Sequence, residues 1–215
     1  MPINQTIYQA IVDGDMATAV TEVKTEIDRG IPPQEILEQS MIPAMDEVGR
    51  LFDCNEYFVP ELLISGRAMQ GCMTILNPYL IQSGVEKVGR IVIGTVQGDM
   101  HDIGKNLVGS MLEGGGFEVV DLGVDVSPEK FLSVAQEKEG TIIGLSALLT
   151  TTMPAMKRVV DTRNAQGLQT SHKIMIGGAP VTQDFAQNIG ADGYSANASG
   201  AVALARQFVT NESHE

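Results

Sequence analysis

The chain has 215 residues, and its 27 acidic against 14 basic side chains give a formal net charge of −13. This excess repels nucleic-acid phosphates and anionic lipid surfaces, so we expect neither nucleic acid nor a membrane as a partner. The amino-terminal stretch has neither the basic start nor the apolar run of a signal peptide. We therefore expect a cytoplasmic protein, long enough for two small domains.

The amino-terminal part of the chain has the periodicity of helices. Apolar residues recur at every third or fourth position, and the alternation typical of strands is absent. Pro32-Pro33 suits a helix start, Pro43 should interrupt or kink the helix that follows, and residues 55–60 should separate the last two helices. We predict a bundle of four or five helices that forms a cap domain at residues 1–87.

After residues 82–87 the pattern changes to short runs rich in Val and Ile that alternate with amphipathic segments. This alternation predicts an α/β domain at residues 88–215, with a flavodoxin-like or Rossmann-like, doubly wound parallel sheet of five strands in the order 2-1-3-4-5. In such a sheet, ligands bind beyond the carboxyl ends of the strands. The predicted strands are Ile91–Val96, Glu118–Leu122, Thr141–Ala147, Lys173–Gly177 and a less marked one near Asp192–Ser195.

The loop after the first predicted strand carries a histidine, His101, with a carboxylate two residues earlier, Asp99. A histidine on such a turn can project its imidazole outward, and the carboxylate can accept from the ring nitrogen that does not ligate a metal. Gly98 and Gly104 leave space for a large flat ligand close to the backbone. Taken alone, His101 would be a surface or capping residue and Asp99 an Asx turn, while Asp102 suits the negative charge of a helix start.

Two further loops have unusual compositions. Residues 146–152 follow the third predicted strand with a high density of small hydroxyls, of which Thr151 or Thr152 should cap the next helix. The fourth strand ends in Gly177-Gly178, a bend without side chains that could line a narrow slot, although such a pair alone is usually just a turn. In the expected strand order all three loops meet at one edge of the sheet.

Taken together, these loops resemble the cobalamin-binding domains in three motifs, Asp99-x-His101-x-x-Gly104, Ser146-x-Leu148 and Gly177-Gly178. In that family the nucleotide base of the cofactor is displaced and buried beside the sheet while the histidine binds cobalt. The resemblance implies that His101 is the cobalt ligand and that Asp99 and Thr152 complete a proton relay with it. The residues that it assigns to cofactor binding are Gly98, Asp99, Met100, His101, Asp102, Ile103, Gly104, Ser146, Leu148, Thr150, Gly177, Gly178 and Ala198.

Individual roles follow from the same resemblance. Ser146 would contact the buried base, Thr150 would contact the lower face of the corrin ring, and Ala198 would line the nucleotide tail. Thr152 stands where the related methionine synthase module usually has Ser, and it keeps the hydroxyl that would bond Asp99.

The likeness extends to the amino-terminal half, which resembles the helical cap of methyl-type corrinoid proteins in residues 45–52 and 57–62. In such caps apolar side chains shield the methyl group on the upper face of the cofactor. The matching positions here are Phe52, Val59 and Leu62. Periodicity alone would assign Phe52 and Val59 to the bundle core.

The resemblance is closest to the small corrinoid proteins of methylamine, methanol and methoxy-compound methyltransferase systems. It implies a methyl carrier that holds methylcobalamin or a related corrinoid and cycles between cobalt(I) and methylcobalt(III). A substrate-specific methyltransferase would load the cobalt, a second would pass the methyl group to tetrahydrofolate or a thiol, and a reductive activator would rescue cobalt(II). Because no further catalytic domain fits in this length, we expect methyl transfer to need these partners, with residues 82–87 as the hinge of the cap.

Two other classes share the sheet motifs. One is the small subunit of an adenosylcobalamin mutase, which usually lacks a long helical cap, and the other is a cobalamin-dependent sensor, which would carry a basic DNA-binding head. A metal-dependent phosphohydrolase would need more than the three histidines present. A receiver domain would need an aspartate where Ser146 ends the third strand. We expect His172 and His214, which lack partners in the sequence, to lie on the surface.

Overall fold

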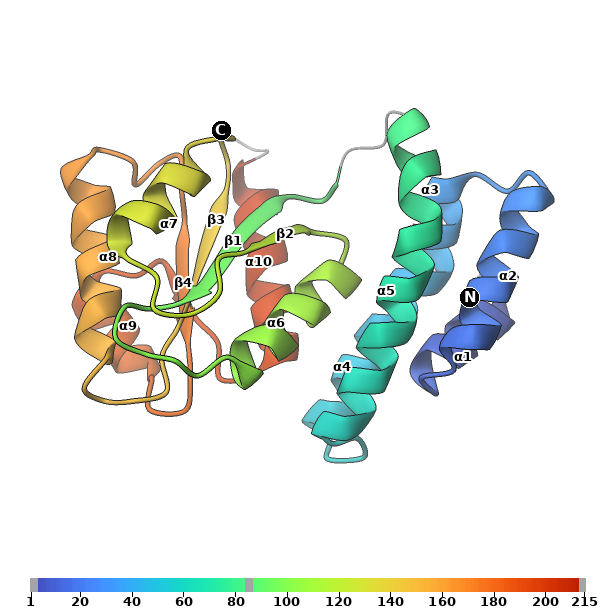
Figure 1. Ribbon diagram of the computed structural model, residues 1–215, viewed down its shortest axis with the longest axis horizontal. Helices are drawn as coiled ribbons and strands as arrows, with labels where there is room; N and C mark the ends of the chain where they lie inside the picture. Colours follow the sequence, from blue (N-terminus) through green and yellow to red (C-terminus); the bar gives the residue numbers. More distant parts are fainter. Residues whose placement is uncertain (1–3, 84–86, 213–215) are drawn as a thin grey trace. The chain divides into compact units, whose positions relative to one another are not determined.

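Figure 1 shows the computed structural model, which describes residues 4–83 and 87–212. The chain divides into two compact units, residues 1–87 with 110–116 and residues 88–109 with 117–215. No helix in the described ranges is both long and apolar enough to span a bilayer. Residues 84–86 of the predicted hinge, and His214, lie outside the described ranges.

The amino-terminal unit is the predicted helical bundle. Its first two helices begin at side-chain caps, because Asn4 accepts from the Thr6 and Ile7 amides and Asp15 accepts from the Thr18 amide. The hydroxyls of Tyr57 and Ser65 both donate to the Val12 carbonyl at the end of the first helix, which links this helix to residues later in the chain. The elements are α1 (Gln5–Val12), α2 (Met16–Asp28), α3 (Pro33–Ile36), the π-helical turn η1 (Leu37–Met41), α4 (Ile42–Asp53) and α5 (Val59–Gln82).

Pro43 changes the hydrogen bonding of the helical path without ending the path. The Ile42 amide donates to the Leu37 carbonyl, which closes the wide turn of η1 between α3 and α4. Pro43 then lies in the first turn of α4, where the missing N–H of a proline costs least. The interruption predicted at Pro43 therefore takes the form of a π-helical turn, and the helix start predicted at Pro32-Pro33 is confirmed by α3.

The carboxy-terminal unit contains a five-stranded parallel sheet in the order β2-β1-β3-β4-β5, which confirms the predicted fold class. The central strands are almost completely buried and rich in Val and Ile, as parallel strands covered on both faces must be. The strands are β1 (Arg90–Thr95), β2 (Glu118–Asp121), β3 (Ile142–Ser146), β4 (Ile174–Gly177) and β5 (Gly193–Tyr194).

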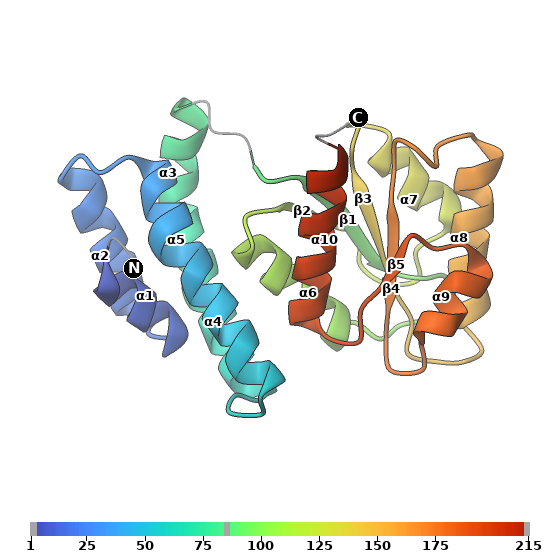
Figure 2. The same cartoon turned by 180° about the vertical axis from the view of Figure 1, so that it is seen from behind.

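Helices cover both faces of this sheet (Figures 1 and 2). The buried residues Phe131 of α7 and Met156 of α8 pack in one core with strand residues such as Val92 and Ile143. Helix α10 lies on the opposite face. The helices of this domain are α6 (Ile103–Gly114), α7 (Pro128–Ala135), α8 (Met153–Ala165), α9 (Gln183–Ile189) and α10 (Ala198–Glu212).

His172 is buried, so its predicted surface position is wrong. Only 3% of the residue is exposed, and its Nδ1 lies 3.1 Å from the Thr141 carbonyl oxygen. The buried Arg163 side chain donates to the His172 carbonyl, at 3.1 Å, and pairs with Asp192. These partners come from distant parts of the chain, so no local sequence pattern could reveal them. This network lies at the amino-terminal ends of β3 and β4, whereas the predicted ligand loops follow the carboxyl ends of the strands.

Candidate functional site

The loop between β1 and α6 is a tight turn that places an aspartate inside the protein and a histidine at its surface. Gly98 has a φ of +88°, a conformation that favours glycine, and the Asp99 amide donates back to the Val96 carbonyl. As a result the Asp99 side chain is fully buried, while half of the His101 side chain is exposed.

The Asp99 carboxylate joins this loop to the loop after β3. Its Oδ1 accepts from the His101 amide at 3.1 Å and lies 2.7 Å from His101 Nδ1. Its Oδ2 accepts from the Leu148 amide at 2.8 Å and from the Thr152 hydroxyl at 2.7 Å, with the Leu149 amide at 3.3 Å. One buried carboxylate thus orders both loops.

Asp99 stays ionised in this environment. Burial alone would raise the pKa of the carboxyl, but the hydrogen bonds from Thr152, the Leu148 amide and His101 outweigh it and hold the pKa well below its usual range. A carboxylate can only accept, so the proton of a neutral His101 ring resides on Nδ1. The lone pair of Nε2 is then directed away from Asp99 and is available to a ligand.

Thr152 stands at the predicted capping position but does not cap. Helix α8 begins at Met153 with Thr152 as its N-cap residue, yet the side chain accepts from none of the helix amides. Its hydroxyl lies 2.7 Å from Asp99 Oδ2 and 2.8 Å from the Leu149 carbonyl. The single hydroxyl proton therefore has two acceptors, and the charged Asp99 is the stronger one. Thr151, the other predicted cap, is exposed.

The glycine pair after β4 passes very close to the end of β3. Gly178 has a φ of +132°, and a Cβ atom there would lie 1.9 Å from the Ala147 carbonyl oxygen. A Cβ on Gly177 would lie 3.1 Å from the Ser195 carbonyl oxygen. Only glycine fits at position 178, so this bend is bare because the neighbouring backbone requires it. Ser146 is half-buried beside it.

The remaining predicted residues of the sheet domain differ in exposure. Ala198, the first residue of α10, is buried with 4% of its surface exposed, whereas Thr150 and Asp102 are exposed.

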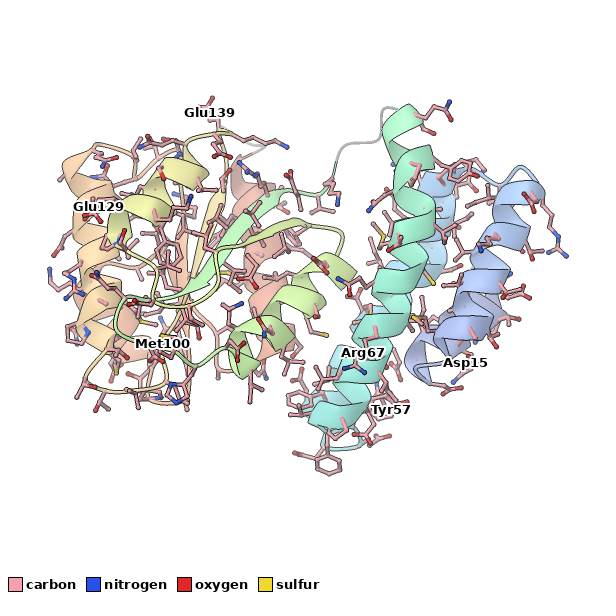
Figure 3. The ribbon with its side chains drawn as sticks, viewed as in Figure 1. Asp15, Tyr57, Arg67, Met100, Glu129 and Glu139 are labelled. Carbon is pink, nitrogen blue, oxygen red and sulfur yellow. The ribbon has the colours of Figure 1, made fainter. Side chains whose placement is uncertain are left out.

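Exposed apolar side chains flank His101. Met100 and Ile103 in its own loop are 68% and 76% exposed, and Leu148 and Leu149 in the β3–α8 loop are each 43% exposed. Figure 3 labels Met100 on the loop that leads from β1 to α6. Apolar side chains gathered beside one imidazole are typical of a binding surface.

Gly104 lies beside this apolar surface, and open space surrounds it. A Cβ added to Gly104 would meet no atom within 4 Å. The fold itself therefore does not require a glycine at this position, in contrast to Gly178.

The three predicted cap residues lie at different depths in the bundle. Phe52 near the end of α4 is half-buried, and Val59 at the start of α5 is 40% exposed. Leu62 is 1% exposed and packs in the bundle core. Phe58, which the sequence did not single out, is 60% exposed next to Val59, in the turn where Figure 3 labels Tyr57.

Three residues that support the His101 loop were not predicted from the sequence. The Lys105 side chain is 1% exposed and donates to Asp121, which anchors the first turn of α6 to the end of β2. Thr95 and Asp125 hydrogen-bond the loop backbone. Asp125 has a φ of +54°, but no sequence pattern marks that conformation in an aspartate. An acidic residue soon after a predicted strand was the only available signal.

Comparison with known proteins agrees with this geometry. Residues 89–203 and residues 3–77 each match a family described as B12 binding domain. The chain is 44% identical over 192 residues to dimethylamine corrinoid protein 1 of Methanosarcina acetivorans, covering 89% of this chain and 88% of that protein.

Two solved structures are also similar. A cobalamin-binding protein from Desulfitobacterium hafniense has a TM-score of 0.79 and 36% identity, covering 94% of this chain and 96% of that one. A chain of the methanol:cobalamin methyltransferase complex from Methanosarcina barkeri has a TM-score of 0.82 and 31% identity, covering 95% of this chain and 78% of that one.

Proposed function

This chain belongs to the B12 binding domain family, and from that premise we propose that it is a corrinoid methyl carrier in which His101 ligates cobalt. The observation that carries the proposal is the hydrogen-bonded series Thr152–Asp99–His101, with distances of 2.7 Å at both steps. Its similarity to a dimethylamine corrinoid protein and to a chain of a methanol:cobalamin methyltransferase complex supports the methyl-transfer role.

The residues present fit such a cofactor. Exposed apolar side chains beside His101 suit a flat macrocycle, and the open space at Gly104 lets it approach the helix start. A single imidazole suffices when a macrocycle already holds the metal. We assign the lower face to the stretch 98–104 with Leu148 and Thr150, and the nucleotide tail to Ser146, Gly177, Gly178 and Ala198.

The apolar residues of the bundle are the proposed shield of the upper face. Val59 and Phe52 retain exposed surface and can serve this role, and Phe58, the neighbour of Val59 in the chain, is exposed as well. Leu62, which is buried, would support them from within the core.

When bound, the cofactor supplies a cobalt centre that accepts and donates a methyl group. The chain controls the imidazole that faces it. Asp99 holds the proton of His101 on Nδ1 and so keeps Nε2 free to bind the metal. Were the imidazole to leave the metal, Asp99 would still hold the Nδ1 proton and so keep the ring in the same orientation. The Thr152 hydroxyl keeps the carboxylate in place throughout.

Methyl transfer needs partners, and we propose three kinds. A substrate-specific methyltransferase loads the carrier, in line with the methyltransferase complex that contains a similar chain. A second methyltransferase delivers the methyl group to tetrahydrofolate or a thiol, and a reductive activator restores the inactive oxidised cofactor. We propose a cytoplasmic location for this cycle.

The test is whether a histidine of this chain binds the metal. The chain has three histidines, so protein grown with ¹⁵N-histidine, loaded with cobalamin and reduced to cobalt(II) reports ligation through its electron paramagnetic resonance spectrum. We expect the nitrogen splitting to change with the label and to be lost in His101→Ala. The control is Gln97→Ala, an exposed residue of the same loop that has no proposed role at the cofactor. A nitrogen splitting that changes neither with the label nor in His101→Ala would refute the proposal.

A further inference from the structure

The backbone that carries His101 is held by two residues from outside its own loop. Packing contributes little there, because Met100 and Ile103 on either side are mostly exposed. The Asp99 side chain orients the imidazole ring and also accepts from the His101 amide, but it belongs to the same turn as His101. Hydrogen bonds with Asp125 and Thr95 hold the main chain of this turn from outside it.

Asp125 reaches the loop from the connection between β2 and α7. Its Oδ1 accepts from the Gly98 amide at 2.7 Å, and its own amide donates to the Asp99 carbonyl at 3.0 Å. The following residue, Val126, donates to the Thr95 carbonyl at 3.0 Å and pairs with Val96 in a parallel bridge. Asp125 is thus itself fixed to the end of β1, and it binds two successive residues of the turn.

Thr95 fixes the other end of the turn. It is fully buried as the last residue of β1, and its hydroxyl donates to the His101 carbonyl at 2.7 Å. Its amide donates to the Gly123 carbonyl at 2.9 Å, so the strand and both loops form one hydrogen-bonded frame. The backbone is therefore bonded at Gly98, Asp99 and His101 by groups outside the segment 98–101.

The identity of residue 125 indicates that its carboxylate is used. With a φ of +54°, a glycine would adopt this backbone without steric cost, whereas any other residue is less favourable there. Here its carboxylate takes up the Gly98 amide, which would otherwise lack a protein acceptor in the part of the chain that the structure describes.

We propose that Asp125 and Thr95 are positioning residues for His101, which set the main-chain path from Gly98 to His101 so that Nε2 meets the metal. This inference rests on the proposed function, since it presupposes that His101 is the ligand. Both side chains bond the backbone of this turn, and the imidazole itself is bonded by Asp99. Their effect passes through the backbone, because a metal–nitrogen bond tolerates only small displacements of the residue that provides it.

Two pairs of variants separate positioning from general stability. Asp125→Gly keeps the left-handed backbone and removes the acceptor, whereas Asp125→Asn keeps an acceptor oxygen and also tolerates this φ. Thr95→Val keeps the shape of the side chain and removes the donor, whereas Thr95→Ser keeps the donor and removes only a methyl group. In each pair, the first variant removes the hydrogen-bonding group and the second variant retains it.

Two readouts are measured on each variant. The first is the fraction of cobalt(II) protein whose nitrogen splitting responds to ¹⁵N-histidine. The second is amide hydrogen exchange at Gly98 and His101 in the cofactor-free protein, which needs no cofactor at all. We expect Asp125→Gly and Thr95→Val to lower the ratio of histidine-on to histidine-off protein by roughly 5- to 30-fold and to speed local exchange by a similar factor. Asp125→Asn and Thr95→Ser should remain close to the wild type.

The outcomes are distinguishable. Wild-type splitting and exchange in folded Asp125→Gly and Thr95→Val would overturn the inference, as would equal losses in the two members of each pair. If one variant fails to fold, the other pair still decides the question. If the wild-type protein itself shows no splitting that responds to labelled histidine, the proposed function fails, and the exchange data then report only on the backbone frame.

Discussion

A substitution at Gly104 should raise the stability of the cofactor-free protein and weaken its binding of cobalamin. Gly104 lies in the first turn of α6 with an ordinary helical backbone, and a Cβ there meets no atom within 4 Å. The perturbation is Gly104→Ala. Its matched control is Gly109→Ala in the same helix, where a Cβ meets only Val119, at an ordinary 3.9 Å.

The expected magnitudes follow from this geometry. Replacing a helical glycine that has room for a methyl group stabilises a protein by about 0.4–1 kcal/mol. For a protein of this size, that corresponds to a rise in Tm of roughly 1–4 °C for either cofactor-free variant. A methyl group pressed against a ligand that occupies the open space at Gly104 costs about 1–3 kcal/mol. Gly104→Ala should therefore bind cobalamin roughly 5- to 150-fold more weakly, and Gly109→Ala should bind it like the wild type.

Thermal unfolding followed by circular dichroism gives the Tm values, and equilibrium dialysis against cobalamin gives the affinities. Unchanged affinity in Gly104→Ala would show that no ligand approaches the backbone there, which would refute the placement of the corrin ring. Equal losses of affinity in both variants would point to the helix as a whole and not to the space beside Gly104.

Two further predictions concern the buried carboxylate. Thr152→Val should lower the free energy of unfolding of the cofactor-free protein by about 1.5–3 kcal/mol, because the charged Asp99 loses a buried hydrogen-bond donor. Thr152→Ser keeps the donor and should lower it much less. Equal losses for the two variants in urea unfolding would contradict this. Because the folded pKa of Asp99 is lowered, its contribution to stability is complete above the unfolded value of about 3.9 and is lost as the pH falls through the lower folded value. The difference in unfolding free energy between wild type and Asp99→Asn should thus be constant near neutrality and shrink below about pH 4; a difference that does not vary with pH would show that the charge is not the cause.

The sequence by itself determined the elements and their order. Short Val-rich and Ile-rich runs alternate with amphipathic segments, and this local pattern is sufficient for a doubly wound parallel sheet. The pairing of His101 with Asp99 was also predictable, because two residues of one turn lie close together whatever the rest of the chain does. The glycine pair was visible in the sequence, but the reason for it was not. A Cβ on Gly178 would lie 1.9 Å from the Ala147 carbonyl oxygen, which only the fold reveals.

Tertiary structure alone decided how the site is held. Only the family resemblance pointed to the Thr152 hydroxyl as a partner of Asp99, 53 residues earlier, and nothing in the sequence pointed to the bond between Asp125 and the Gly98 amide, 27 residues apart. The burial of His172 depends in the same way on Thr141, 31 residues earlier. Periodicity and local propensity report on neighbours within a few positions, whereas these contacts depend on how parallel strands bring distant loops to one edge. The local pattern therefore identified the chemical groups, and the folded chain chose their partners.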